Sequence, residues 1–463
     1  MQSYSYIFQE IKNCEKEKRI KVCPNILMQS IEEENIVKNI VNPCYGDPSS
    51  RNVWHGGYLG EGTFIKPCSF FYDEEEQVGF LKAGPRFHIA FEPQSVKSAI
   101  VTCGGLCPGF NVVIRELVMS LWYNYGVRQV YGIQWGFEGF YDGSEWVNLQ
   151  PLCVRDIHLL GGTFLGTSRG GFDAGKIIDS VEENGVNMIF AIGGDGTHKG
   201  IEALHKEISK RKLKIIICGI PKTIDNDIPY IDRSFGFESS VEQAVKVIQA
   251  ANIEARSNKN GLGLVKLFGR ECGFIALEAS LASRDVNICL IPESHFYLYG
   301  ENGLLNYIFE RLKIKKHCVI VIAEGSASAV LDKKINTVEI FDKSGNPLLP
   351  DIGVILKEEI LQYAKRNKYE IALKYIDPTY IIRTCAANSF DKNYCSKLAQ
   401  NAVHSAFAGY TNFTSGYFNN KPVIIPVEFL NKKGKRRILI EKDFEYLSLL
   451  ASTGQPSFDS KRL

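Results

Sequence analysis

The sequence predicts an α/β protein with two doubly wound lobes and mainly parallel sheets, preceded by an N-terminal extension. Three observations predict this fold. The chain has 463 residues, whereas single hydrophobic cores stop growing at about 250–300 residues. From Lys97 onward, short apolar runs end in loops that contain glycine or aspartate. Helical stretches follow these loops, and such alternation is typical of βαβ units.

The apolar runs are the predicted strands. Each is apolar throughout, as expected for strands that are buried on both faces of a parallel sheet. They cover residues 99–102, 130–133, 187–192, 214–220, 263–268, 287–292 and 318–323. The helices predicted between them cover residues 112–125, 200–211, 239–256, 271–283, 304–312 and 394–408. In such Rossmann-like folds, ligands bind beyond the carboxyl ends of the strands.

Changes in this pattern set the expected domain boundaries. Residues 1–96 show little sustained periodicity and are expected to form the extension. Residues 97–231 are expected to form the first lobe, to which residues 409–440 return. The second lobe is expected over residues 232–408, and a C-terminal tail over residues 441–463.

Composition and charge exclude several classes of protein. The chain is 45% hydrophobic and 23% charged, which is ordinary for a soluble enzyme. A net charge of +2 does not suit a polyanion-binding protein. Two short basic clusters, at residues 313–316 and 432–437, are interpreted as solvated surface. No apolar stretch approaches the roughly 20 residues of a membrane-spanning helix. We therefore expect neither nucleic acid nor a membrane as partner.

The cysteines and the chain ends indicate a location. The 13 cysteines include no C-x-x-C pair, which favours a reducing compartment over a zinc or disulfide framework. The first residues lack the basic region and apolar run of a secretory signal, so we expect a cytoplasmic protein. The final Lys461-Arg462-Leu463 resembles the peroxisomal S-K-L address only loosely, because lysine replaces a small residue.

Two glycine-rich turns follow predicted strands. After the strand ending at residue 102, G-G-L-C-P-G places Gly104 and Gly105 before a helix, where bare N–H groups suit a phosphate; a tight structural turn would use the same glycines. After the strand ending at residue 192, G-G-D-G-T places Asp195 among backbone donors. Mg²⁺ takes one or two carboxylates plus phosphate oxygens, so Asp195 is a candidate ligand. The alternative is a plain Asp-Gly turn. His198 is expected to be a solvated helix residue.

A third segment carries a family resemblance. Residues 221–227 read P-K-T-I-D-N-D, and F-G-F, G-L-V-K-L-F-G-R, L-A-S-R-D-V and I-A-E-G follow in that order. From about residue 83 to 414, the chain resembles the 6-phosphofructokinase family, in particular its long plant and protist branch. The resemblance implies a nucleotide on the first lobe and a sugar phosphate on the second.

The resemblance also implies roles for individual residues. Asp225 would accept the proton of the 1-hydroxyl of fructose 6-phosphate, with Thr223, Asp227 and Arg270 completing the catalytic set. Nucleotide-binding roles fall on Gly105, Arg169, Gly170, Gly194, Asp195, Gly196 and Thr197, with Asp195 as the ligand of Mg²⁺. Sugar-phosphate-binding roles fall on Thr223, Asp225, Phe268, Gly269, Arg270, Glu324, Lys374, Tyr380 and Arg383. For Lys374 and Tyr380, ordinary surface or core packing is an equal alternative. The resemblance further implies ATP as donor and a homo-oligomeric, allosteric enzyme, tetrameric or dimeric.

Three positions qualify the resemblance. Phe268 stands where the family usually has methionine, and Gly261 stands where short bacterial enzymes have an arginine that reaches across a subunit interface. Gly196 favours ATP, because pyrophosphate-using relatives carry a second aspartate there that would repel the α-phosphate. Lys222, however, is shared with the pyrophosphate enzymes.

The sequence leaves other functions open. The chain could use pyrophosphate, or serve as a non-catalytic regulatory subunit, although such a subunit is expected to lose Asp195, Asp225 or Arg270. G-G-D-G-T also occurs in NAD kinases and lipid kinases. Those kinases do not account for the P-K-T-I-D-N-D and F-G-R segments.

Overall fold

The computed structural model describes residues 64–65, 80–86, 88–331, 349–431 and 444–458. These residues form two compact units whose chain segments alternate. The first contains the described residues within Met1–Lys222, Ile228–Phe235 and Ala386–Lys435. The second contains those within Thr223–Asp227, Gly236–Cys385 and Arg436–Leu463.

The first unit is organised around one sheet with strand order β1-β2-β13-β12-β7-β6-β3-β4-β5 in the described part of the chain. Neighbours from β12 to β4 pair in parallel, and the pairings at both ends are antiparallel. The strands are β1 Phe64–Ile65, β2 Phe80–Lys82, β3 Lys97–Thr102, β4 Gln129–Ile133, β5 Val147–Asn148, β6 Met188–Gly193, β7 Ile216–Pro221, β12 Phe413–Phe418 and β13 Lys421–Pro426.

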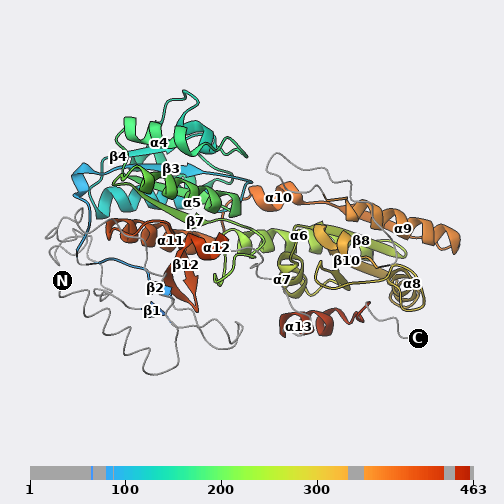
Figure 1. The fold of residues 1–463 in the computed structure, drawn as a ribbon. Helices are drawn as coiled ribbons and strands as arrows, with labels where there is room; N and C mark the ends of the chain where they lie inside the picture. The colour runs from blue at the N-terminus through green and yellow to red at the C-terminus, as the bar shows by residue number, and fades with distance from the viewer. Residues whose placement is uncertain (1–63, 66–79, 87, 332–348, 432–443, 459–463) are drawn as a thin grey trace, which may run out of the picture. The chain divides into compact units, whose positions relative to one another are not determined.

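Helices cover both faces of this sheet (Figure 1). Alternate residues of β3 and β6, such as Val101 and Ile189, pack with α4 and α5 in one apolar core. On the other face, α11 packs against α2 and β7. The helices are α2 Phe110–Met119, followed by a π-helical turn at Ser120–Asn124, and α3 Pro151–Val154, α4 Ala174–Glu183, α5 Asp195–Lys210, α11 Ser389–Phe407 and α12 Val427–Asn431. All six residues of β6 and of β7 are buried, as a doubly covered sheet requires.

The second unit has a parallel sheet with strand order β11-β8-β10-β9. Helices α8 and α9 pack on one face through a core that includes Leu264, Ile308 and Leu356, and α6 packs against β8 and α7. The elements are β8 Gly261–Leu267, β9 Ile288–Leu290, β10 His317–Ala323, β11 Ala372–Ile376, α6 Phe237–Ser257, α7 Phe274–Ser283, α8 Leu304–Lys315, α9 Ile352–Arg366, α10 Thr379–Thr384 and α13 Phe444–Thr453.

The predicted α/β fold with mainly parallel sheets is confirmed, and each predicted strand corresponds to an observed one. The units differ from the expected boundaries in several places, since Thr223–Asp227 falls in the second unit and residues 232–235 fall in the first. Helix α11, expected in the second lobe, groups with the first unit because it packs on α2 and β7. Strand β2, from the expected extension, joins the first sheet. The expected tail contains α13, which packs on α7.

Two surface features of the sequence can be placed. Residues 313–316, at the end of α8, are exposed, and Lys313 pairs with Glu310 at 2.6 Å. Residues 432–437 and 461–463 lie outside the described residues. Of the helices that the structure describes, none combines the length and the apolar character that crossing a membrane demands.

Candidate active site

The two glycine-rich turns of the first unit lie at the same edge of its sheet. Strands β3 and β6 are parallel neighbours, with Thr102 opposite Ile192. The turn after each strand therefore begins at the carboxyl edge, where α/β sheets bind ligands. The N–H of Cys103 donates to the carbonyl of Ile192 at 2.9 Å, which joins the starts of the two turns.

The first turn is held by the segment that carries Arg169. The N–H of Gly104 donates to the carbonyl of Ser168 at 3.0 Å, and the Thr167 hydroxyl donates to the carbonyl of Gly104 at 2.7 Å. A Cβ added at Gly105 would lie 3.3 Å from a terminal guanidinium nitrogen of Arg169. The structure thus brings Gly105 and Arg169 together, and a planar guanidinium suits phosphate oxygens. Gly104 has φ +86°, so this turn also has a structural need for glycine.

The second turn opens helix α5. Gly194 precedes the helix, and its carbonyl accepts the N–H groups of Thr197 and His198 at 2.9 and 3.1 Å. Asp195 and Gly196 are exposed in the first helical turn. A helix N-terminus with exposed donors is a ready anion site. A Cβ added at Gly196 would meet no described atom within 4 Å.

Lys222 lies between these two turns, although the sequence indicated it only as a marker of donor choice. Its N–H donates to the carbonyl of Gly193 at 3.0 Å. Its Nζ is 3.5 Å from the position a Cβ would take at Gly104, and 3.9 Å from the corresponding position at Gly194. The ammonium group is thus next to both phosphate-suited turns. Burial raises the pKa of the neighbouring Cys103 thiol to about 12, with Lys222 opposing the shift.

His198 was predicted to be a solvated helix residue, and this prediction is wrong. Its side chain is buried, with 2% of its surface exposed. Nδ1 lies 3.0 Å from the carbonyl of Gly194, and Nε2 lies 3.0 Å from the hydroxyl of Thr414 on β12. The face of α5 that carries His198 packs on the sheet instead of meeting water. Burial lowers the pKa of His198 below 6.5, which favours the neutral imidazole at pH 7.

The loop of the second unit that contains Asp225 is closed by its own side chains. The N–H of Asp225 donates to the Thr223 hydroxyl at 3.1 Å, and that hydroxyl donates to Asp227 at 3.2 Å. Cys272 donates to the carbonyl of Asp225 at 3.4 Å. Asn226, between the two aspartates, has φ +57°. The structure thus brings Thr223, Asp225 and Asp227 together. Burial, and then the charges of Asp225, Asp227 and Glu293, raise the pKa of the Cys272 thiol.

Two further turns of the second unit meet through glycines. The N–H of Gly325 donates to the carbonyl of Gly269 at 2.9 Å. A Cβ added at Gly325 would lie 2.0 Å from the carbonyl oxygen of Arg270, so only glycine allows this approach. Burial raises the pKa of Glu324, while Arg270 and Lys266, and more weakly Arg383, oppose this shift. Glu324, Arg270 and Arg383 therefore share one electrostatic environment.

Replacing Gly325 with alanine will destabilise this contact. We expect a loss of about 1–3 kcal/mol of unfolding free energy, because the added methyl group forces the two backbones apart. The matched control is Gly175→Ala in α4, where the new Cβ would make only an ordinary 3.4 Å contact. The control should be neutral or stabilising by about 0.5–1 kcal/mol. Denaturant unfolding measures both variants, and equal stability of the two would contradict the close approach.

The remaining residues that were predicted for the site are less closely associated with the turns described above. The guanidinium of Arg383 lies over the ring of Tyr380, 4.7 Å from its centroid, and Tyr380 is 71% exposed. Lys374 is exposed on β11. Phe268 is half-buried at the end of β8, and Gly170 lies beside Arg169 with φ +89°. At Gly261 a Cβ would lie 2.0 Å from the carbonyl oxygen of Ala255, so this backbone leaves no room for the bacterial arginine.

Lys266 is a residue that sequence reasoning missed. Its Nζ lies 3.0 Å from Asp351 and 2.8 Å from Asp377. Asp351 caps α9 by accepting the N–H groups of Gly353 and Val354. Asp377 accepts the N–H of Thr379 at the start of α10, the helix that carries Arg383. Nothing in the local sequence indicates these pairs, because the partners lie far along the chain.

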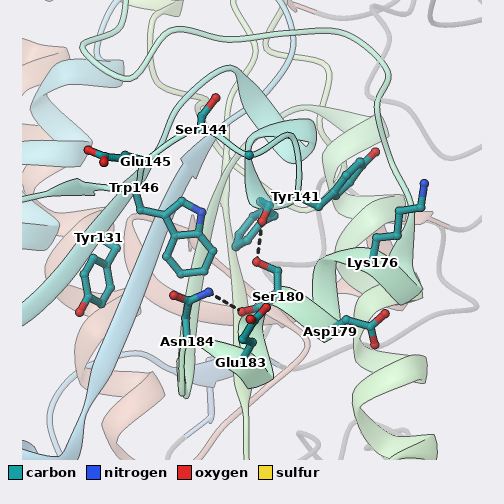
Figure 2. A pocket seen from close by; sticks show the side chains of 12 residues that line it. Tyr131, Tyr141, Ser144, Glu145, Trp146, Lys176, Asp179, Ser180, Glu183 and Asn184 are labelled. Carbon is teal, nitrogen blue, oxygen red and sulfur yellow. Dashed lines mark hydrogen bonds between the residues drawn. The ribbon is translucent and has the colours of Figure 1, made fainter.

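A separate pocket of about 860 Å³ lies beside α4 (Figure 2). Tyr131 and Trp146 form one wall, and Lys176 and Ser180 lie on the helix side. None of its lining residues belongs to the predicted site.

The two glycine-rich turns of the first unit offer one carboxylate as a metal ligand, that of Asp195. Within the described ranges there is no group of three or more His, Cys, Asp or Glu side chains suited to a metal. Asp195 is exposed at the N-terminus of α5. This donor set fits Mg²⁺ carried with phosphate oxygens, which needs one or two protein carboxylates, and it does not fit a dedicated protein cage.

The fold and the two turns define an α/β protein of the phosphate-binding class. The sequence model of the family described as Phosphofructokinase matches residues 97–406. The chain belongs to the phosphofructokinase family. It is 50% identical over 417 residues to ATP-dependent 6-phosphofructokinase 7 of Arabidopsis thaliana, covering 90% of this chain and 85% of that protein.

Solved structures share the fold. A pyrophosphate-dependent phosphofructokinase from Nitrosospira multiformis matches with a TM-score of 0.64 at 15% identity, covering 78% of this chain and 93% of the other. A phosphofructokinase from Pichia pastoris matches with a TM-score of 0.58 at 22% identity, covering 73% of this chain. This chain spans about a third of the Pichia chain, 35%.

Proposed function

We propose that this chain is an ATP-dependent 6-phosphofructokinase, which transfers the γ-phosphoryl group of ATP to the 1-hydroxyl of fructose 6-phosphate in glycolysis. The observation that carries this proposal is the 50% identity, over nine tenths of the chain, to a relative with that name. The presence of Asp195, Asp225 and Arg270 argues against a non-catalytic subunit.

The roles of the residues follow from the chemistry of phosphoryl transfer, which depends on positioning and charge neutralisation. Asp225 accepts the proton of the attacking hydroxyl, and Thr223 holds the loop that presents it. Arg169 and Lys222 neutralise phosphate oxygens beside the turns of the first unit. Arg270, Glu324 and Arg383 bind the sugar phosphate in the second. Asp195 would hold Mg²⁺, which supplies charge neutralisation for the donor phosphates when bound.

The choice of donor is proposed from Gly196. The open space at its Cβ position leaves room for the α-phosphate of a nucleotide. Because the backbone there accepts a side chain without a clash, Gly196→Asp changes charge while keeping the turn. We expect this variant to lose about a hundredfold in kcat/KM for ATP, since juxtaposed like charges cost several kcal/mol. Gly196→Ala is the matched control and should lose far less.

The test is a coupled assay of fructose 1,6-bisphosphate formation by the purified chain, with Mg²⁺ and either ATP or pyrophosphate. Turnover with ATP alone is the expected result. A specific observation, the placement of Lys222 between the two turns, favours pyrophosphate as a second candidate donor. Faster turnover with pyrophosphate would establish that candidate, and no turnover with either donor would favour a regulatory subunit.

A homo-oligomeric and allosterically regulated enzyme is proposed on the family resemblance alone, and a cytoplasmic location on the 13 cysteines without a C-x-x-C pair. Light scattering coupled to size-exclusion chromatography distinguishes a tetramer or dimer from a monomer.

A further inference from the structure

The buried His198 is not used by the proposed chemistry, yet it contacts the turn that is proposed to hold the donor phosphates. Its side chain connects the carbonyl of Gly194, in that turn, with the Thr414 hydroxyl on β12. It lies over β7 at Gly219, where an added Cβ would come within 2.9 Å of Nε2 and 3.1 Å of the Thr414 hydroxyl oxygen. A glycine in a central strand thus makes the space that this bridge occupies.

The hydrogen bonds define the tautomer of the ring. The Gly194 carbonyl can only accept, so Nδ1 must carry the proton and donate to it. In a neutral ring Nε2 is then an acceptor, and the hydroxyl of Thr414 donates to it. Both polar atoms of the ring are satisfied. The backbone of His198 is held as well, because the side-chain amide of Asn431 donates to its carbonyl at 3.2 Å.

Fixing the Gly194 carbonyl also fixes the next N–H group. In a trans peptide unit the C=O of one residue and the N–H of the next point in opposite directions. The Gly194 carbonyl accepts the backbone N–H groups of Thr197 and His198, and the Nδ1 proton of the ring adds a third donor that holds it toward the helix. The N–H of Asp195 therefore points away from the helix body, as a phosphate-binding donor must. The same peptide plane also fixes the position of the backbone nitrogen and Cα of Asp195, the candidate Mg²⁺ ligand.

We propose that His198 is a positioning residue for nucleotide binding, which ties the G-G-D-G-T turn to β12 through Thr414. This inference rests on the proposed function, which supplies the identity of the nucleotide. The bridge couples the orientation of one phosphate donor to β12, a strand that follows the matched family region of residues 97–406.

The test compares His198→Leu, which keeps bulk but forms no hydrogen bond, with His198→Gln, whose amide can donate to Gly194 and accept from Thr414. His198→Leu should raise the KM for ATP, and the Kd for Mg·ADP by calorimetry, about tenfold, the effect of one lost hydrogen bond to a half-buried carbonyl. The KM for fructose 6-phosphate should change less than about twofold. His198→Gln should recover most of the affinity for the nucleotide.

Thr414→Val supplies an independent variant, because it removes the hydroxyl and keeps the shape. It should weaken Mg·ADP binding alone, yet add nothing in the His198→Leu background, since it acts through the ring. Additive effects, equal losses for both substrates, or a lower Tm with unchanged Mg·ADP binding would each overturn the inference. Calorimetry separates it from the proposed function: an inactive wild type that still binds Mg·ADP refutes the reaction alone, and a wild type that binds no Mg·ADP refutes both.

Discussion

Asp225→Asn will lower kcat about 10²- to 10⁴-fold, the usual contribution of a positioned general base. The amide cannot take the proton of the attacking hydroxyl, whereas the loop around it stays closed. Two hydrogen bonds of the loop, to Thr223 and from Cys272, use the N–H and carbonyl of Asp225, which the asparagine keeps. Steady-state kinetics with varied fructose 6-phosphate measure the effect, and the KM should change little.

The control for this prediction is Asp285→Asn, an aspartate that follows α7 and has no proposed role in the site. It should retain wild-type kcat. If Asp225→Asn kept more than about a tenth of the wild-type kcat, Asp225 would not be the base. Thermal unfolding of each variant ensures that a lost activity is not a lost fold.

Lys266→Met will lower the free energy of unfolding by about 1.5–3 kcal/mol, the usual contribution of hydrogen bonds to charged groups, because the side chain loses its ion pairs with two carboxylates. The side chain of Lys266 is only 12% exposed and bridges Asp351 and Asp377. The matched control is Lys313→Met, whose solvent-exposed pair with Glu310 should contribute little to stability. Denaturant unfolding measures both. A loss of similar size in the two variants would contradict the structural role of Lys266.

The same change should raise the KM for fructose 6-phosphate. Lys266 is among the charges that act on Glu324, and its partner Asp377 begins the segment leading into α10 and Arg383. Adding Asp377→Asn to Lys266→Met should restore part of the lost stability, because one unpaired carboxylate is then removed.

The stability that is lost in Lys266→Met depends on pH with a defined sign. Burial opposes the ionisation of Asp377, but hydrogen bonds from Lys266 and Thr379 hold its pKa below 3.8. Burial likewise opposes the charge on Lys266, but Asp377 and Asp351 raise its pKa above 10.5. A lowered carboxyl pKa stabilises above its unfolded value, and a raised lysine pKa stabilises below its own. The difference between wild type and Lys266→Met should therefore be constant between about pH 5 and 9, and shrink as the pH falls below 3.8.

Much of the fold could be predicted because buried parallel strands are apolar throughout. Strands β6 and β7 stand out in the sequence for this reason, and each is followed by a segment with candidate site residues. Strand β11 was missed because its residues are mostly half-buried and include Lys374. Helix α11 was found but expected in the second lobe, whereas it packs on α2 and β7, because sequence periodicity shows which face is apolar and not what covers it.

The candidate site was predictable to the same extent. The glycines and charged residues that follow the strands can be identified in the sequence, together with the order in which they occur. The environment of Lys266 and of His198 was not, because both depend on partners brought together by the sheets: Asp351 and Asp377 for one, Thr414 for the other. A lysine within a strand and a histidine on a helix carry no local mark of such partners.

The place of β12 in the first sheet has a consequence for synthesis on the ribosome. Strand β7 pairs with β12 through Cys218 and Phe413, so its partner emerges roughly two hundred residues later. At 5–20 residues per second, that edge of β7 stays unpaired for about 10–40 s before β12 is synthesised. During this interval the nascent first unit presents an unpaired apolar strand, which is an aggregation hazard. Slow translation of the second unit would prolong this exposure, so expression yield should depend on chaperones that protect the nascent chain.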